Sequence, residues 1–106
     1  MSSLKEENYL KAIYNLAEKN DGMAGNMSIA HELSVNPATV SDMLKRLHEK
    51  KLIIYTKQKG ATLTTEGREV AVKIIRKHRL WEVFLMEKMM FSWDEVHEVA
   101  EQLEHI

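Results

Sequence analysis

The sequence has no cysteine, no long apolar run and no signal-peptide pattern. Without cysteine there is no disulfide, no thiolate nucleophile and no cysteine-bound zinc, so a metal site must draw on His, Glu, Asp, Asn or Met. No stretch approaches the roughly 18 uncharged apolar residues of a membrane span. The amino terminus also lacks the basic segment followed by an apolar one that marks secretion. The sequence therefore predicts a cytoplasmic protein without a membrane partner.

The charges are distributed unevenly along the 106 residues, although the formal net charge is only −1. Residues 1–64 hold nine Lys and Arg against seven Asp and Glu, a net +2, whereas residues 65–106 hold six against nine, a net −3. The hydrophobic share of 44% is ordinary for a folded protein, and the length suits one domain with a real core. The modestly basic first half suits binding to DNA, and the acidic second half suits binding to a cation.

The first half of the chain begins with a predicted helix over residues 3–19. Ser3 and Glu6 have the spacing of a capping box at its start. A polar run over residues 20–26, which contains two glycines, is expected to end this helix. The predicted apolar stripe consists of Leu4, Leu10, Ile13, Tyr14 and Ala17.

Two further helices are predicted to follow at short spacing. The first covers residues 28–33, and Val35 is expected to fill the turn after it. Asn36 is placed to cap a second helix, which begins at Pro37 and ends near residue 50. Two short helices joined by a tight turn make a helix-turn-helix. The alternative is a plain αα-hairpin in a helical bundle.

A β-hairpin is predicted directly after the second of these helices. Residues 52–56 are β-branched and aromatic, residues 57–60 form a turn that ends in glycine, and residues 61–64 can return as a second strand. A hairpin with a basic tip at this place is a wing. We therefore expect a mainly α fold with a small β-hairpin, in which residues 1–64 form a winged helix-turn-helix that binds double-stranded DNA.

The candidate DNA-binding residues lie at the start of the second helix, on its outer side and on the wing. Short hydroxyl side chains there can reach base edges or phosphates, and Asp42 either reads a cytosine amino group or faces solvent. No Arg or Gln is placed for bidentate base readout, so specificity is expected to rest on weak contacts and DNA shape. The candidates are Asn36, Pro37, Ala38, Thr39, Ser41, Asp42, Lys45, Lys57 and Lys59.

A long helix, capped by Thr65, is predicted over residues 66–89, and a second capping box at Ser92 and Glu95 starts a last helix. An apolar cluster at the end of the long helix and the start of the last one is either ordinary core or a homodimer surface. Helix-turn-helix proteins commonly pair by two-fold symmetry to read palindromic DNA, which motivates the second reading. The candidate dimer residues are Phe84, Leu85, Met89, Met90, Phe91 and Trp93.

Ionisable side chains gather on one side of the last predicted helix. At about 100° per residue, they share a narrow face opposite an apolar stripe. These side chains are His97, Glu101, Glu104 and His105. Two imidazoles and two carboxylates suit a divalent cation such as Mn, Fe or Zn. The alternative is a solvated face with His–Glu contacts worth a few tenths of a kcal/mol each.

The remaining histidines divide into two kinds. His78 has Glu82 one helical turn later, so this pair can share a cation with the last helix if the two helices pack together. His31 and His48 lie in the DNA-binding half without such a partner, and we expect them at the surface or facing DNA. The segment that starts at His97 lacks the second histidine of the HExxH metalloprotease motif. We therefore expect neither an enzyme nor a small-molecule substrate.

Five short segments carry a resemblance that covers essentially the whole chain. They are ENYLKAIY at 7–14, NPATVS at 36–41, LTTEG at 63–67, RKHRL at 76–80 and EQLEH at 101–105. Together they resemble the amino-terminal part of the diphtheria toxin repressor family of metal-dependent transcriptional regulators, and within it the manganese transport regulators. The resemblance implies that residues 65–106 start a helical dimerisation and metal-binding domain. Because such proteins usually continue further, we expect the chain to be an amino-terminal fragment.

The resemblance also implies two metal sites. The principal site would use Asn8, Glu101, Glu104 and His105, and the second site His78, Glu82 and His97. Asn8 replaces the usual Asp or Met, and Lys11 replaces the Glu of the manganese regulators, which argues against a close two-metal cluster of their type. Glu101 stands where iron-responsive members carry Cys. A site of oxygen and nitrogen ligands favours manganese over iron, with zinc, cobalt or nickel as substitutes in vitro.

The implied mechanism is that of a metal-activated repressor. Metal would tie the first helix to the last two, fix the separation of the recognition helices in a homodimer, and so favour binding to a palindromic operator of metal-homeostasis genes. Two alternatives stay open from the residues alone. One is a winged-helix regulator that binds DNA without metal, and the other is a winged-helix protein-interaction module that binds no nucleic acid.

Overall fold

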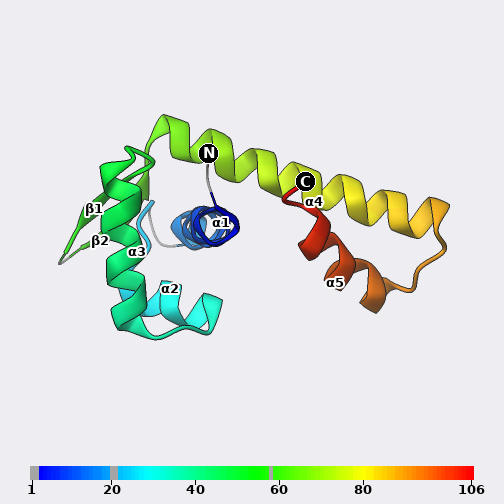
Figure 1. Cartoon of the computed structure of the whole chain (residues 1–106), viewed down its shortest axis with the longest axis horizontal. Coiled ribbons are helices and arrows are strands. Elements are labelled where there is room, and N and C mark those ends of the chain that lie inside the picture. Colours follow the sequence, from blue (N-terminus) through cyan, green and yellow to red (C-terminus); the bar gives the residue numbers. More distant parts are fainter. Residues whose placement is uncertain (1–2, 20–21, 58) are drawn as a thin grey trace. The chain divides into compact units, whose positions relative to one another are not determined.

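The computed structural model describes residues 3–19, 22–57 and 59–106 (Figure 1). Within these ranges the chain forms five helices and one two-stranded sheet. In chain order they are α1 (Leu4–Lys19), α2 (Asn26–Leu33), α3 (Pro37–Glu49), β1 (Ile53–Thr56), β2 (Gly60–Leu63), α4 (Thr65–Lys88) and α5 (Trp93–Leu103). They form two compact units, Met1–Ala71 and Val72–Ile106, which divide within α4. No helix in the described ranges is both long and apolar enough to cross a bilayer.

Helix α1 starts with the predicted capping box. The Ser3 backbone N–H donates to Glu6 Oε1 at 2.9 Å, and the Glu6 N–H donates to Ser3 Oγ at 3.1 Å, which confirms it. Leu10 and Ile13 are fully buried, but Leu4 is exposed. Leu4 lies roughly 120° around the helix from Leu10, and so it does not share the buried face. Part of the predicted loop over 20–26 lies outside the described residues, and its last residue already belongs to α2.

Helices α2 and α3 form the predicted helix-turn-helix. The turn begins at Ser34, which has a left-handed backbone, and Asn36 Oδ1 accepts from the Ala38 N–H at 2.9 Å as the cap of α3. The prediction that Val35 fills this turn is wrong, because its side chain is exposed. Its backbone holds the turn instead, by an N–H donated to the Ala30 carbonyl at 3.0 Å.

The core of the first unit lies where α1, α2, α3 and the hairpin meet. The hairpin is antiparallel, pairs Ile53 with Leu63, and lies beside α3, as the wing of a winged helix does (Figure 1). Each strand begins one residue away from its predicted start. The buried core side chains include Leu10, Ile13, Ile29, Val40, Leu44, Leu47 and Ile53. The predicted winged helix-turn-helix is therefore confirmed.

A partly buried ion pair joins α1 to the end of α3. Lys50 Nζ, at the C-cap of α3, lies 2.7 Å from Glu6 Oε2 and 2.9 Å from Glu6 Oε1. The Glu6 side chain is 3% exposed, whereas that of Lys50 is 44% exposed. Burial alone would raise the pKa of Glu6, but the hydrogen bond and charge of Lys50, with the hydrogen bonds of Ser3, outweigh it and lower this pKa. Glu6 therefore stays ionised inside the unit.

Glu6→Gln is expected to lower the free energy of unfolding by about 1–2 kcal/mol near pH 7, because the amide loses the charge-assisted bond to Lys50. Since the folded pKa of Glu6 is lowered, its contribution is present above the unfolded pKa and is lost as pH falls through the folded pKa. Urea unfolding near pH 7 and at about pH 3 measures both effects. The exposed Glu18→Gln is the control on the same helix. A difference between Glu6→Gln and wild type that is the same at both pH values would contradict the prediction.

The long helix α4 starts one residue before its predicted start, and its cap is not Thr65. The Thr64 hydroxyl accepts from the Gly67 N–H at 3.1 Å and donates to the Lys51 carbonyl at 2.8 Å, so Thr64 caps the helix and Thr65 is its first residue. The second predicted capping box, between Ser92 and Glu95, is confirmed at the start of α5.

Candidate metal centre and DNA-binding surface

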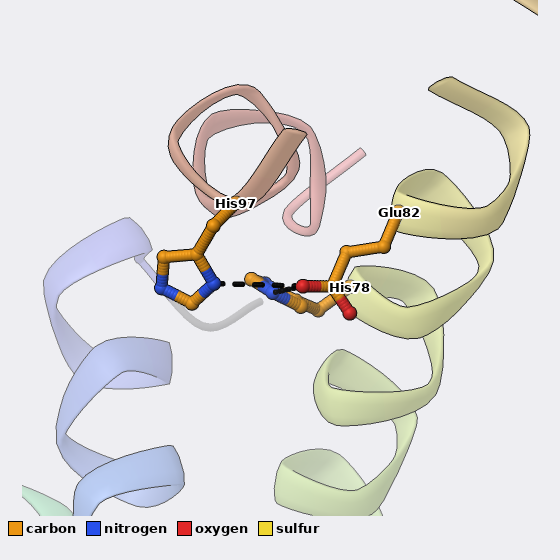
Figure 2. Close-up of side chains that lie close together, drawn as sticks. All are labelled: His78, Glu82 and His97. Atoms are coloured by element: carbon orange, nitrogen blue, oxygen red, sulfur yellow. Dashed lines mark hydrogen bonds and ion pairs between the residues drawn. The ribbon is translucent and has the colours of Figure 1, made fainter. Parts of the chain in front are cut away.

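Three potential metal ligands converge between α4 and α5, within the second unit. His78 and Glu82 lie one turn apart on α4, and His97 comes from α5; one ligand atom from each lies within 4.8 Å of the other two (Figure 2). Glu82 Oε2 is 3.2 Å from His78 Nε2 and 3.5 Å from His97 Nδ1. The two imidazole rings meet edge to face, with centroids 5.0 Å apart. A carboxylate oxygen thus lies between two imidazole nitrogens.

Glu82 is the central group of this cluster and is buried. Its burial would raise the pKa of the carboxyl group. The hydrogen bond and charge of His78 act against this, as do a hydrogen bond from His97 and the charge of Arg79, and together they hold the pKa of Glu82 below its usual value. The carboxylate is therefore ionised. One anionic oxygen and two imidazoles are a donor set that fits a divalent transition metal.

Glu104 orients one of these histidines. It forms the C-cap of α5, its side chain is 1% exposed, and its Oε1 lies 2.6 Å from His78 Nδ1. Its other oxygen, Oε2, lies 3.3 Å from His105 Nε2. A carboxylate on one ring nitrogen fixes the plane of a histidine and leaves the other nitrogen for a ligand. Here Nδ1 of His78 is held by Glu104, and Nε2 faces Glu82.

The structure divides the ionisable face that the sequence predicts on the last helix. His97 and Glu101 are 61% and 54% exposed and lie 3.4 Å apart, Nε2 to Oε1. Glu104 and His105 are only 1% and 10% exposed. Glu104 keeps a helical backbone conformation, and it is buried where its side chain contacts His78 of α4. Within the described ranges, only the His78, Glu82 and His97 group brings three such ligand atoms together.

The remaining predicted ligand, Asn8, lies half-buried on α1, in the first unit. Lys11, one turn later, is half-buried as well. The assignment of Asn8, Glu101, Glu104 and His105 to a principal metal site stays a prediction.

Eight of the nine candidate DNA-binding residues are exposed on α3, its cap and the wing. They are Asn36, Pro37, Ala38, Thr39, Asp42, Lys45, Lys57 and Lys59. The ninth, Ser41, is half-buried, and its hydroxyl accepts a hydrogen bond from Asn26 Nδ2 at 2.9 Å. Asn26 also donates to Tyr55 Oη at 3.2 Å. The sequence did not predict that Asn26 and Tyr55 lie beside the candidate DNA-binding residues, because nothing in the local sequence relates positions 29 residues apart.

The two histidines of the first unit are exposed, as expected, but His48 has a partner. Its Nδ1 accepts the Tyr55 backbone N–H at 3.1 Å, which joins the last turn of α3 to the first strand of the wing. The structure therefore gives His48 a local structural role that its exposure alone does not suggest. His31 lies on α2 without a comparable link between elements among the described hydrogen bonds.

The candidate dimer residues differ in exposure. Leu85 is buried within its own unit and Phe91 is half-buried. The exposed ones are Phe84, Met89, Met90 and Trp93. Beside them on α4 lies an open groove of about 650 Å³, lined mainly by apolar side chains that include Leu80, Trp81, Val83 and Phe84. The second unit thus presents more apolar surface than a solvated helix pair requires.

A winged helix-turn-helix joined to a helical unit with a histidine–carboxylate cluster defines a class, that of DNA-binding proteins with a candidate metal centre. Comparison with known families specifies the class further. Residues 1–61 match the iron dependent repressor N-terminal DNA binding domain, and residues 64–106 match the iron dependent repressor metal binding and dimerisation domain. The chain belongs to the iron-dependent repressor family.

Individual relatives include an HTH-type transcriptional regulator and an iron-dependent repressor. The transcriptional regulator MntR of Geobacillus kaustophilus is 33% identical over 93% of this chain and 69% of its own length. The iron-dependent repressor IdeR of Mycobacterium leprae is 36% identical over 94% of this chain and 43% of its own length.

Solved structures show the same similarity. The manganese regulator SloR is 46% identical with a TM-score of 0.77, and ScaR with bound Zn²⁺ is 39% identical with a TM-score of 0.79. Each match covers 94% of this chain and 46% of the solved chain, so this chain spans less than half the length of these structures.

Proposed function

We propose that this chain is the DNA-binding and metal-sensing part of a transcriptional repressor. Loaded with a divalent cation, it binds double-stranded DNA as a homodimer. The observation that carries the proposal is the cluster of His78, Glu82 and His97 in a chain whose other unit is a winged helix. The membership of the family, with its two domain types, supports both halves of the proposal.

The cation held by this cluster is manganese in preference to iron. Ionised Glu82 supplies the anionic oxygen, and the two histidines supply nitrogen. When bound, the metal links α5 to α4 through ligands from both helices. The similarity to the manganese regulator SloR favours manganese, and the Zn²⁺-bound structure of ScaR makes zinc, with cobalt and nickel, a suitable substitute in vitro. Asn8, Glu101, Glu104 and His105 are the proposed ligands of the principal site, and the cluster of His78, Glu82 and His97 is the second site.

The functional boundary proposed here lies between residues 64 and 65. Residues 1–64 bind DNA with α3 in the major groove and the wing lysines on the backbone. Residues 65–106 bind metal and contribute to dimerisation, for which the exposed apolar side chains around Met89 to Trp93 are the proposed surface. Two-fold pairing implies a palindromic operator, here one that controls metal-homeostasis genes in the cytoplasm. No enzymatic step and no small-molecule substrate are required.

DNA binding by the chain is expected to depend on Mn²⁺. A duplex can be enriched from a random library by the protein with Mn²⁺ present, and its affinity then measured with Mn²⁺ and with chelator. We expect binding at least about tenfold tighter with the metal, because a coupling free energy of 1–3 kcal/mol is usual between two sites. The complex should contain two chains per duplex by analytical ultracentrifugation.

Each outcome of this experiment favours one function. Binding that chelator does not change would support the metal-independent winged-helix regulator. Absence of any salt-dependent DNA binding, with or without metal, would leave the protein-interaction module, because contacts to phosphates make affinity fall with salt.

A further inference from the structure

Three polar side chains from separate elements meet beside the recognition helix. Asn26 is the first residue of α2, Ser41 lies on α3, and Tyr55 lies in β1. The amide nitrogen of Asn26 is 2.9 Å from Ser41 Oγ and 3.2 Å from Tyr55 Oη. An amide nitrogen carries two hydrogens and accepts none, so it is the donor in both contacts.

Because Asn26 donates twice, both hydroxyl oxygens act as acceptors towards it, and their own protons remain for other partners. The proton of Ser41 reaches the Pro37 carbonyl at 3.5 Å, the outer limit for such a bond. For the Tyr55 hydroxyl, no acceptor is found among the residues that the structure describes. Asn26 thus fixes the positions of two hydroxyl groups that can still donate.

The Tyr55 side chain is held from a second direction. Its backbone N–H donates to Nδ1 of His48, in the last turn of α3. The strand is therefore attached to α3 at two points two turns apart, directly through His48 and indirectly through Asn26 and Ser41. This double attachment sets the distance between the wing and the recognition helix. Two hydroxyls held this way need little reordering when a ligand binds.

We propose that the hydroxyls of Ser41 and Tyr55 form a binding site for a DNA backbone phosphate, with Asn26 as the positioning residue. The inference rests on the proposed function in taking DNA as the ligand. Hydroxyl donors suit the anionic oxygens of a phosphate, and side chains of Ser and Tyr commonly supply such contacts. Their location between α3 and the wing, the two elements expected to contact DNA, argues for the backbone over a free anion. Ser41 then positions the protein on DNA and does not read a base.

The test uses the whole chain with Mn²⁺ and the duplex enriched by wild type. Tyr55→Phe and Ser41→Ala should each weaken DNA binding by about tenfold, as loss of a hydrogen bond to a charged group does. Asn26→Leu should weaken DNA binding at least as much as either of these two substitutions does. Tyr14→Phe is the matched control, because Tyr14 is also half-buried, with the Arg68 guanidinium 5.3 Å above its ring. This control should bind like wild type.

Neutral methylphosphonate groups, placed one at a time along the duplex, separate a phosphate contact from a structural effect. Wild type should lose about tenfold in affinity at one position, where Tyr55→Phe should lose almost nothing further. A Tyr55→Phe variant that binds like wild type, or whose loss is the same at every methylphosphonate position, would overturn the site and leave the proposed function standing. A wild-type chain that enriches no duplex would overturn both. Inorganic phosphate that competes with DNA only in Tyr55→Phe would also contradict the site.

Discussion

Replacing Gly67 by alanine is expected to lower the free energy of unfolding of the first unit by about 3 kcal/mol, the upper part of the range for overpacking. Gly67 lies in the first turn of α4, and an added Cβ would lie 1.9 Å from the Leu52 carbonyl oxygen and 2.9 Å from its carbon. Both atoms belong to the backbone, so no side chain can rotate away. The same oxygen accepts the Thr64 N–H at 3.1 Å, and moving it would break that bond next to the cap of α4.

Urea unfolding followed by circular dichroism measures this effect, with Gly25→Ala as the control. A Cβ at Gly25 would meet nothing within 4 Å, and its φ of −80° is ordinary for any residue. Gly25→Ala should therefore lower the free energy of unfolding by less than about 1 kcal/mol. This amount includes the preference for Gly over Ala at a helix N-cap. Equal stabilities of Gly67→Ala and Gly25→Ala would show that the contact between Leu52 and α4 is not as close as described.

Local signals in the sequence predicted most of the fold. The capping boxes at Ser3 and Ser92, and the Asn36 cap before Pro37, involve atoms no more than three residues apart, so their spacing alone identifies them. The choice between Thr64 and Thr65 as the cap of α4 could not be made this way. Thr64 is favoured because its hydroxyl also reaches the Lys51 carbonyl, 13 residues earlier in the chain.

Local signals in the sequence also predicted part of the candidate metal centre. The spacing of His78 and Glu82 places them on one side of α4, and the periodicity of α5 places His97 on the side opposite its apolar stripe. The point at which α5 ends was not predictable, because no glycine or proline follows Leu103. The contact between Glu104 and His78 was not predictable either, because it joins residues 26 positions apart on two helices. The contacts of Asn26 with Ser41 and Tyr55 depend on tertiary packing and carry no periodic signal.

Glu82→Gln is expected to weaken Mn²⁺ binding at the cluster by about 100-fold or more, because even residues that only support a ligand cost 10–100-fold when changed. The amide keeps the size of the side chain but replaces the ionised oxygen between His78 and His97 by a neutral one. Isothermal titration with Mn²⁺ measures the change directly. DNA binding that depends on Mn²⁺ should fall in the same variant, since the metal can activate only as far as it binds.

The control for net charge is Glu87→Gln, an exposed carboxylate on the same helix that lines the apolar groove and lies outside the cluster. Removing this charge changes the net charge of the chain by the same amount as Glu82→Gln does, so equal small losses in both variants would show that Glu82 binds no metal. A large loss in Glu82→Gln alone requires direct coordination or a rearranged cluster. Zn²⁺ separates these two, because an intact pair of His78 and His97 still supplies two nitrogen ligands. Retained, weaker Zn²⁺ binding by Glu82→Gln would therefore identify Glu82 as a ligand, whereas complete loss would indicate that the cluster had rearranged.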